Sequence, residues 1–265
     1  MRSIKYTIAV VATLAASTSF AGQFGTIDIA WNQQSARFGN GGGFDFDYSN
    51  LDFDGVAETQ GWVLSPSIKN GQLYTFCLEL AQTITSASRT YMIDPLTSAQ
   101  VPPTSGTISA NSAAALNLMA VNFFESAKDG SLAGILNVAT GKGYSAATAA
   151  AAFQLAVWEL ALDRSVGGDS DISLSTTAWN PVVGANANGH LGNTAIKAGA
   201  DWLLSKVDGL NGDDVSDVAG KMTVALTHNN HQEQLIVVSV PEASSLLAFA
   251  SVAGAIGLVM YRRRK

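Results

Sequence analysis

The spacing of hydrophobic residues along this chain changes twice, from short strand-like runs to a helical pattern and back again. Residues 22 to about 107 are mostly strand-like, and Pro95, Pro102 and Pro103 close this region. It contains runs rich in aromatic and β-branched residues: FGTIDIAW, GFDFDYSNLDF, GWVLSPSI and GQLYTFCLEL. Turn signals separate them, GNGGG at 39–43 and Asn70–Gly71, as is typical between strands. The pattern returns in KMTVALTHNN and HQEQLIVVSV near the other end. We therefore expect strands in both regions.

Between these regions the chain is rich in alanine and predicts three helices. The first, SANSAAALNLMAVNFFESAKDG, has Ser109 or Asn111 as its cap and Gly130 as its stop. The second, SAATAAAAFQLAVWELALDRSVGG, begins at Ser145 and ends near Gly167, and the third lies in GNTAIKAGADWLLSKVDG. Strands that enclose a helical stretch predict an α+β fold, in which a strand-built body, either a barrel or a sandwich, carries a helical insertion.

Gln154 lies at the centre of the apolar face of the second predicted helix. At about 100° per residue, its neighbours on that face are Ala147, Ala150, Ala151, Val157, Trp158 and Ala161. The polar residues gather on the opposite side: Ser145, Thr148, Glu159 and Asp163. Burying a primary amide without partners costs on the order of 1–3 kcal/mol, so Gln154 is a candidate for a specific role.

Cys77 is the only cysteine, and it lies in the run GQLYTFCLEL. With a period of two, Tyr74, Phe76, Leu78 and Leu80 form one face, and Leu73, Thr75, Cys77 and Glu79 form the other. A cysteine that merely fills the core would share the face of the aromatic residues. Its place on the more polar face favours a chemical role.

A thiol and a carboxamide together can form an internal thioester. The Cys77 thiolate would attack the Gln154 carbonyl carbon, and ammonia would leave. The product is an activated acyl group that an amine or hydroxyl on another molecule can capture. Apolar cover from Phe76, Phe153 and Trp158 would shield such a bond from water, and Glu79 would orient a proton during its formation or attack.

Both ends of the chain predict targeting segments. Arg2 and Lys5 precede an apolar run at 6–16 and the cleavage pattern Ser19-Phe20-Ala21, which predicts a signal peptide over residues 1–21. Residues 243–261 carry no charge, and a helix of this length is long enough to cross a hydrocarbon core of ~30 Å. Four basic residues follow at 262–265, which places the preceding domain outside the inner membrane.

Charge and cysteine content narrow the possible partners. Of 15 Lys and Arg residues, two lie in the signal and four in the tail; of 21 Asp and Glu residues, only Glu242 is lost. Nine basic and 20 acidic residues then give residues 22–239 a net charge near −11. This charge argues against nucleic acid and anionic lipid as partners. One cysteine excludes an intramolecular disulfide.

The segment at residues 240–265 resembles a PEP-CTERM sorting signal. It has Val240-Pro241-Glu242, then a hydrophobic stretch, then the Arg cluster, although Ala243 stands where Pro is usual. Such signals occur on exported proteins of Gram-negative bacteria that make exopolysaccharide. The resemblance implies processing by an exosortase near the Pro-Glu pair. It also implies a transient inner-membrane anchor, followed by a place at the cell surface or in the extracellular matrix.

Two further motifs resemble those of the TQXA-type thioester domains of bacterial surface adhesins. They are Phe76-Cys77-Leu78-Glu79 and, later in the chain, Phe153-Gln154-Leu155-Ala156-Val157-Trp158. Glu79 and Phe153 depart from the family pattern, which has Thr where Phe153 stands. HQEQLIVV resembles the closing strand, so the likeness covers residues 60–240. It implies one thioester domain over residues 22–239, with a Cys77–Gln154 bond.

The same resemblance implies a function in adhesion or biofilm formation. The domain would attach covalently, once, to amine or hydroxyl nucleophiles on host, matrix or polysaccharide targets. It implies no cofactor, no metal and no turnover. The sequence does not name the target molecule.

Other functions remain open at this stage. A non-covalent matrix or polysaccharide-binding protein would use exposed aromatic residues such as Trp31, Trp62, Trp179 and Trp202, although Trp in a large domain usually lies in the core. A cysteine hydrolase or transglutaminase needs a histidine near the thiolate, and the candidates are His190, His228 and His231. Gln154 would otherwise be a hydrogen-bonded core residue and Cys77 an inert thiol.

The aspartates of FDFDYSNLDFDG invite comparison with a calcium site. Asp45, Asp47, Asp52 and Asp54 supply oxygen ligands of the right type but lack the spacing of an EF-hand loop. Their alternation with Phe44 and Phe46 predicts a half-exposed strand.

Overall fold

One large antiparallel sheet dominates the computed structural model, which describes residues 23–32, 43–64, 71–78, 84–101, 106–163, 193–207 and 220–240. Its strands are β1 (Gly25–Trp31), β2 (Gly43–Phe53), β3 (Val63–Leu64), β4 (Gln72–Cys77), β5 (Arg89–Pro95), β8 (Lys221–Thr227) and β9 (Gln234–Ser239). A separate small pair joins β6 (Gln100–Val101) to β7 (Gly106–Thr107).

The sheet closes on itself because β9 pairs with both β4 and β8. The order β4-β2-β1-β5-β8-β9 therefore returns to β4 as a closed six-stranded antiparallel barrel. Strand β3 adds to β9 at Ser239 and Val238, beyond the part of β9 that pairs with β4. The predicted α+β fold with a strand-built body is confirmed, and the body is a barrel.

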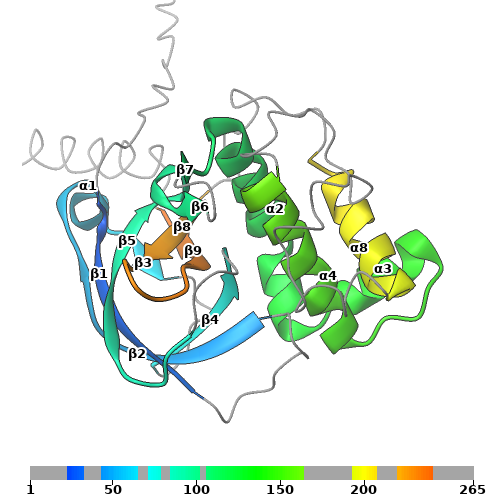
Figure 1. Cartoon of the computed structure of the whole chain (residues 1–265), viewed down its shortest axis with the longest axis horizontal. Helices are drawn as coiled ribbons and strands as arrows, with labels where there is room; N and C mark the ends of the chain where they lie inside the picture. The colour runs from blue at the N-terminus through cyan, green and yellow to red at the C-terminus, as the bar shows by residue number, and fades with distance from the viewer. Residues whose placement is uncertain are drawn as a thin grey trace, which may run out of the picture.

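The helical insertion lies between β7 and β8 and packs beside the strands (Figure 1). It contains α2 (Ala110–Asp129), α3 (Leu132–Thr140), α4 (Ala146–Trp158), a π-helical turn (Glu159–Asp163) and α8 (Thr194–Leu204). Ser109 caps α2 by accepting from the Ser112 N–H at 3.1 Å, and Gly130 ends it with a φ of 84°. Ser145 caps α4 in the same way through Thr148 N–H. These caps are the ones that the sequence indicates.

Two helices escape sequence prediction. Helix α3 and the short helix α1 (Gly55–Thr59) lie in segments with neither a long period nor a strong cap, as does the 3-10 turn at Leu96–Ser98. Strand β5 lies in the region expected to be β, although none of the quoted runs covers it. Conversely, the run GWVLSPSI gives only the two residues of β3 within the described part of the chain. Short elements such as these depend on tertiary pairing more than on local pattern.

Strands β4, β8 and β9 separate two hydrophobic cores. Side chains alternate along them, so the barrel core takes Leu73, Val224, Leu226, Ile236 and Val238. The core between strands and helices takes Phe76, Ala225, Leu235 and Val237 together with α2 and α4 residues such as Leu116, Met119, Phe153 and Leu155. Each fully buried large apolar side chain contributes about 1.5–3 kcal/mol.

Helix α4 differs from the amphipathic helix that the sequence suggests. Every residue from Ala149 to Ala161 is buried, including Glu159 on the side predicted to face solvent. A helix that is buried all round is enclosed by neighbours on each face, here β4, α2, α3 and α8. The prediction of a polar outer face is therefore wrong around Glu159.

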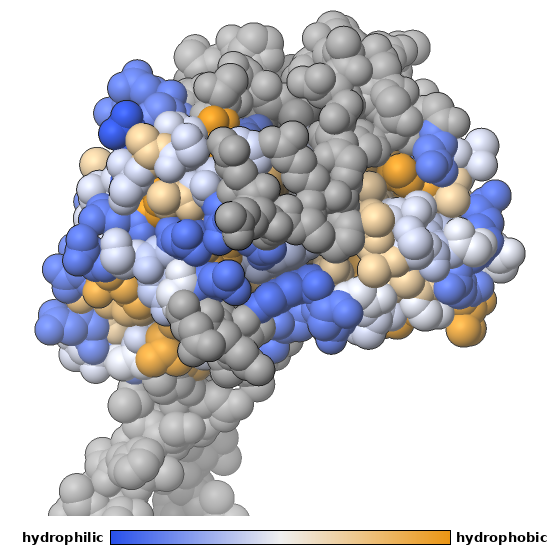
Figure 2. Space-filling view, turned by 90° about the horizontal axis from the view of Figure 1, so that it is seen from below, coloured by the Kyte–Doolittle hydropathy of each residue, from blue (hydrophilic) through white to orange (hydrophobic). Residues whose placement is uncertain are grey.

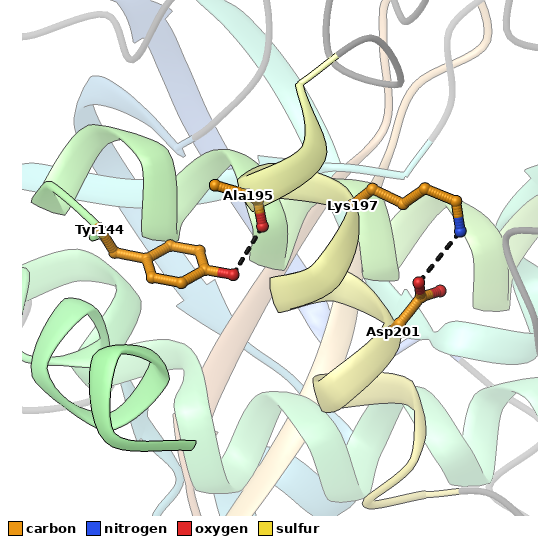
Figure 3. Close-up of polar contacts among 4 residues, drawn as sticks. All are labelled: Tyr144, Ala195, Lys197 and Asp201. Carbon is orange, nitrogen blue, oxygen red and sulfur yellow. Dashed lines mark hydrogen bonds and ion pairs between the residues drawn. The ribbon is translucent and has the colours of Figure 1, made fainter. Parts of the chain in front are cut away.

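Helix α8 approaches α4 closely because of Gly199. A β-carbon at that position would lie 2.9 Å from the Ala152 β-carbon and 3.1 Å from Leu136 Cδ1. The Tyr144 hydroxyl, just before α4, donates to the Ala195 carbonyl at 2.6 Å, and Lys197 pairs with Asp201 within α8 at 3.0 Å (Figure 3). The close approach at Gly199 and the Tyr144–Ala195 hydrogen bond hold α8 against α4, whereas the Lys197–Asp201 pair lies within α8.

The face of the molecule in Figure 2 is largely polar among the coloured residues, and hydrophobic ones form small separate groups. The large exposed apolar side chains of the described residues, Val63, Met92, Ile135 and Val138, are scattered over β3, β5 and α3. None of the helices in these ranges has the length and apolarity needed to cross a membrane. The predicted signal peptide, the hydrophobic tail with Pro241 and Glu242, and Glu79 lie outside the described residues.

Candidate functional site: the Cys77 end of strand β4

Cys77 is the last residue of β4 and lies opposite Gln234, the first residue of β9. The Leu78 N–H donates to the Glu233 carbonyl at 3.0 Å. Leu78 and Glu233 are the next opposite residues along the two strands, and hydrogen-bonded and non-hydrogen-bonded pairs alternate in an antiparallel ladder. Cys77 and Gln234 are therefore a non-hydrogen-bonded pair, the type in which the two α-carbons are closest, about 4.5 Å apart. Both side chains are therefore placed side by side, and both are buried.

The backbone N–H and C=O of Cys77 point the other way, towards β2. Among the described residues, the β2 ladder begins at Gly43, opposite Phe76 and one residue short of Cys77. Gln154 from α4 takes over that role: its Nε2 donates to the Cys77 carbonyl at 2.7 Å, and its Oε1 accepts from the Cys77 N–H at 2.9 Å. The amide of Gln154 thus acts as an added residue of the sheet.

The sulfur of Cys77 contacts a different glutamine. Its Sγ lies 3.7 Å from Oε1 and 3.7 Å from Nε2 of Gln234. A point equally distant from both atoms lies on the plane that bisects the amide, and this plane contains the carbonyl carbon Cδ. Both contacts have hydrogen-bond angles, so Sγ lies near the plane of the amide and roughly 4 Å from Cδ. The sulfur would have to move out of this plane to reach the about 3–3.5 Å of a reactive approach to Cδ.

Two hydrogen bonds fix the orientation of the Gln234 amide. Its Nε2 donates to the Gln232 carbonyl at 3.1 Å, and a carbonyl can only accept. Its Oε1 therefore faces Thr75, whose hydroxyl donates to it at 2.7 Å. Thr75 precedes Cys77 by two residues on β4 and shares its face. Both Thr75 and Gln234 are fully buried.

The residues predicted to shield a thioester occupy the helix side of β4. The rings of Phe76 and Phe153 pack with their centroids 4.5 Å apart, and both are fully buried. Cys77 belongs to the same core cluster as these residues, although strand alternation turns the Phe76 side chain to the face opposite its own. Trp158 is also buried, and its Nε1 has no acceptor within the described ranges. A shielding role for these three residues stays a prediction.

The histidines at the β8–β9 turn form a cluster of their own. The rings of His228 and His231 lie 4.5 Å apart, and Arg89 Nε donates to His231 Nε2 at 3.2 Å. The Tyr91 ring packs on His228. Burial, followed by the charges of His231 and Arg89, lowers the pKa of His228. His190 lies outside the described residues.

The remaining candidates have structural partners. Asp47 accepts from Asn32 at 3.2 Å, and the described part of the chain holds no cluster of three metal-ligating residues. Trp62 is buried against Phe24, and Trp202 packs on Phe123. Trp31 is partly buried, whereas Trp179 lies outside the described residues.

Sequence reasoning missed Gln234 and Thr75 as members of this site. HQEQLIVV was matched only to a closing strand, although Gln234 shares a face with the apolar residues Ile236 and Val238. A polar residue on the buried face of a strand is the sequence feature that could have identified Gln234. Comparisons of the chain with family models, with curated proteins and with solved structures found no match.

Proposed function

We propose that this protein is an exported surface or matrix protein whose Cys77 forms an internal thioester, and that Gln234 rather than Gln154 supplies the acyl group. The observation that carries the proposal is the position of the Cys77 sulfur, 3.7 Å from both polar atoms of the Gln234 amide. The resemblance of the Cys77 and Gln154 motifs to thioester adhesins supports thioester chemistry at Cys77, and it implies Gln154 as the acyl donor, which the test below distinguishes from Gln234.

Gln154 is the weaker candidate because its contacts are with the backbone of Cys77, whereas those of Gln234 are with the sulfur. Both polar atoms of the Gln154 amide bind that backbone at hydrogen-bond distances. Loss of ammonia breaks one bond at either glutamine, at 2.7 Å to the Cys77 carbonyl or at 3.1 Å to the Gln232 carbonyl, so this cost of about 1–3 kcal/mol does not choose between them. Gln154 instead positions the end of β4.

The reaction balances without a cofactor. The sulfur of Cys77 bonds to Cδ of Gln234, the Cδ–Nε2 bond breaks, and the thiol proton leaves with the nitrogen as ammonia. An amine or hydroxyl of a target then attacks Cδ, the C–S bond breaks, and the thiol is restored. Burial of both residues slows hydrolysis of the bond before a target arrives.

Intact mass spectrometry tests this proposal. The freshly purified domain should weigh one ammonia less than its sequence predicts. Treatment with methylamine should add the mass of one methylamine and free the Cys77 thiol for alkylation. Cys77→Ala should abolish both effects. An unmodified mass, with a thiol that alkylates before any amine is added, returns the protein to the non-covalent matrix or polysaccharide-binding class.

Export and sorting are part of the same proposal. The chain would lose residues 1–21 and would be cut near Pro241 and Glu242 by an exosortase-type enzyme, after transient anchoring in the inner membrane of a Gram-negative bacterium. Mapping of the terminal peptides of the secreted protein tests this. Recovery of an intact MYRRRK end would leave only a membrane anchor.

A further inference from the structure

We infer that Thr75 is the oxyanion donor of the thioester reaction, the group that stabilises negative charge on the Gln234 carbonyl oxygen. The inference rests on the proposed Cys77–Gln234 thioester and adds a catalytic residue to it. Neither of the two motifs that carry the family resemblance includes Thr75 in the role of a donor.

The geometry places the Thr75 hydroxyl on the atom where charge develops. Attack by sulfur on Cδ turns the carbonyl oxygen of Gln234 into an oxyanion, and that oxygen already accepts from Thr75 Oγ1 at 2.7 Å. An effective donor lies about 2.7–3.1 Å from the oxyanion once it forms, and a hydroxyl that already binds the ground-state oxygen lies next to the place where the oxyanion must appear. Because Nε2 binds the Gln232 carbonyl at 3.1 Å, the oxygen cannot exchange places with the nitrogen without losing that bond.

Burial increases the effect of a single hydroxyl. Thr75, Cys77 and Gln234 are each at most 1 % exposed. In such surroundings a fixed donor is worth more than it would be in water, since no water molecules compete for the oxyanion. The three residues come from two adjacent strands, so their relative positions are set by sheet register and not by a loop.

The same hydrogen bond serves both steps. During formation, the thiolate adds to Cδ, the carbonyl electrons move to the oxygen that Thr75 holds, and their return expels the nitrogen as ammonia. During capture, an amine adds to Cδ, the charge appears on the same oxygen, and its return expels the Cys77 sulfur. No oxidant, reductant or metal enters either step.

A pair of isosteric variants separates this role from packing. Thr75→Val keeps the shape and the β-branch but removes the donor. Thr223→Val is the matched control, because Thr223 is also a buried strand threonine, on β8, and its hydroxyl has no hydrogen-bond partner among the described residues. Should Thr75→Val fail to fold, Thr75→Ser and Thr75→Ala give a second pair that differs only in the hydroxyl.

The experiment measures the rate of ammonia loss after refolding and the rate of methylamine capture, both by intact mass on the full mature domain. Thr75→Val, or Thr75→Ala in the second pair, should slow each step on the order of 10²-fold. Thr75→Ser and Thr223→Val should stay near the wild-type rates. The infrared carbonyl band of any thioester that Thr75→Val does form should move to higher wavenumber.

The two proposals fail in different ways. A wild-type domain that never loses ammonia overturns the thioester and the role of Thr75 together. A wild-type domain that forms the bond, with Thr75→Val equal to it in both rates and in the carbonyl band, overturns only the role of Thr75.

Discussion

Cys77 meets a buried glutamine on each side of β4 within the sheet, and the two glutamines contact different parts of it. On the side of β2, Gln154 from helix α4 pairs with the backbone of Cys77 as a neighbouring strand would. On the side of β9, Gln234 places its amide against the sulfur. Both amides are fully buried, so burial alone does not identify the reactive one. The atoms that each amide contacts make the distinction.

The comparison also explains why the chain keeps both residues. The two amides hold different parts of Cys77, Gln154 its backbone and Gln234 its sulfur. Gln154 fixes where β4 ends, and the β4–β9 register then sets where the sulfur meets Gln234. A single amide cannot make both sets of contacts.

The largest expected effect comes from removing the proposed acyl donor. Gln234→Leu should abolish ammonia loss and methylamine addition completely, while the domain stays folded, because Leu suits a buried strand position and the lost hydrogen bonds cost about 1–3 kcal/mol. Intact mass and circular dichroism check both outcomes. A variant that still loses ammonia would assign the acyl group to Gln154.

The matching change on the side of β2 should affect stability instead. Gln154→Leu leaves the Cys77 N–H and C=O without these partners, and the free energy of unfolding should fall by about 2–4 kcal/mol. Urea denaturation measures the loss. The folded fraction should still form the thioester, and complete absence of the bond in well-folded protein would contradict the separation of roles.

The sequence predicted the burial of Gln154 and the shared face of Cys77 and Thr75, but not the contact between Cys77 and Gln234. The cap at Ser145 and the helical period place Gln154 inside the fold, and the period of two places Cys77 and Thr75 on one face; both are local properties. The partner of the sulfur depends on the register between β4 and β9, where Cys77 and Gln234 are separated by 157 positions. No local pattern fixes such a register.

Packing behind Gln154 gives a smaller test. Gly199→Ala adds a β-carbon 2.9 Å from that of Ala152, closer than side chains normally approach, so α8 must shift from α4. We expect a loss of about 1–3 kcal/mol in thermal or urea unfolding. Gly134→Ala on α3, where a β-carbon meets no atom within 4 Å, is the control and should not destabilise the domain. Equal effects of the two changes would argue against the close α4–α8 contact.

The smallest effect concerns the turn that leads into β9. Because the pKa of His228 is lowered in the folded state, the unfolded chain binds its proton more readily, and stability is full above about pH 6.5 and declines as the pH falls below it. His228→Gln should make the decline shallower. Urea midpoints at pH 7 and pH 5 measure this. An unchanged pH dependence would mean that His228 does not contribute.

The most direct test of the account is the location of the captured amine. Wild-type domain treated with isotopically labelled methylamine, digested and sequenced by tandem mass spectrometry, should carry the label on Gln234, with Gln154 unmodified and the Cys77 thiol free. Label on Gln154 would contradict the assignment made from the two sides of β4.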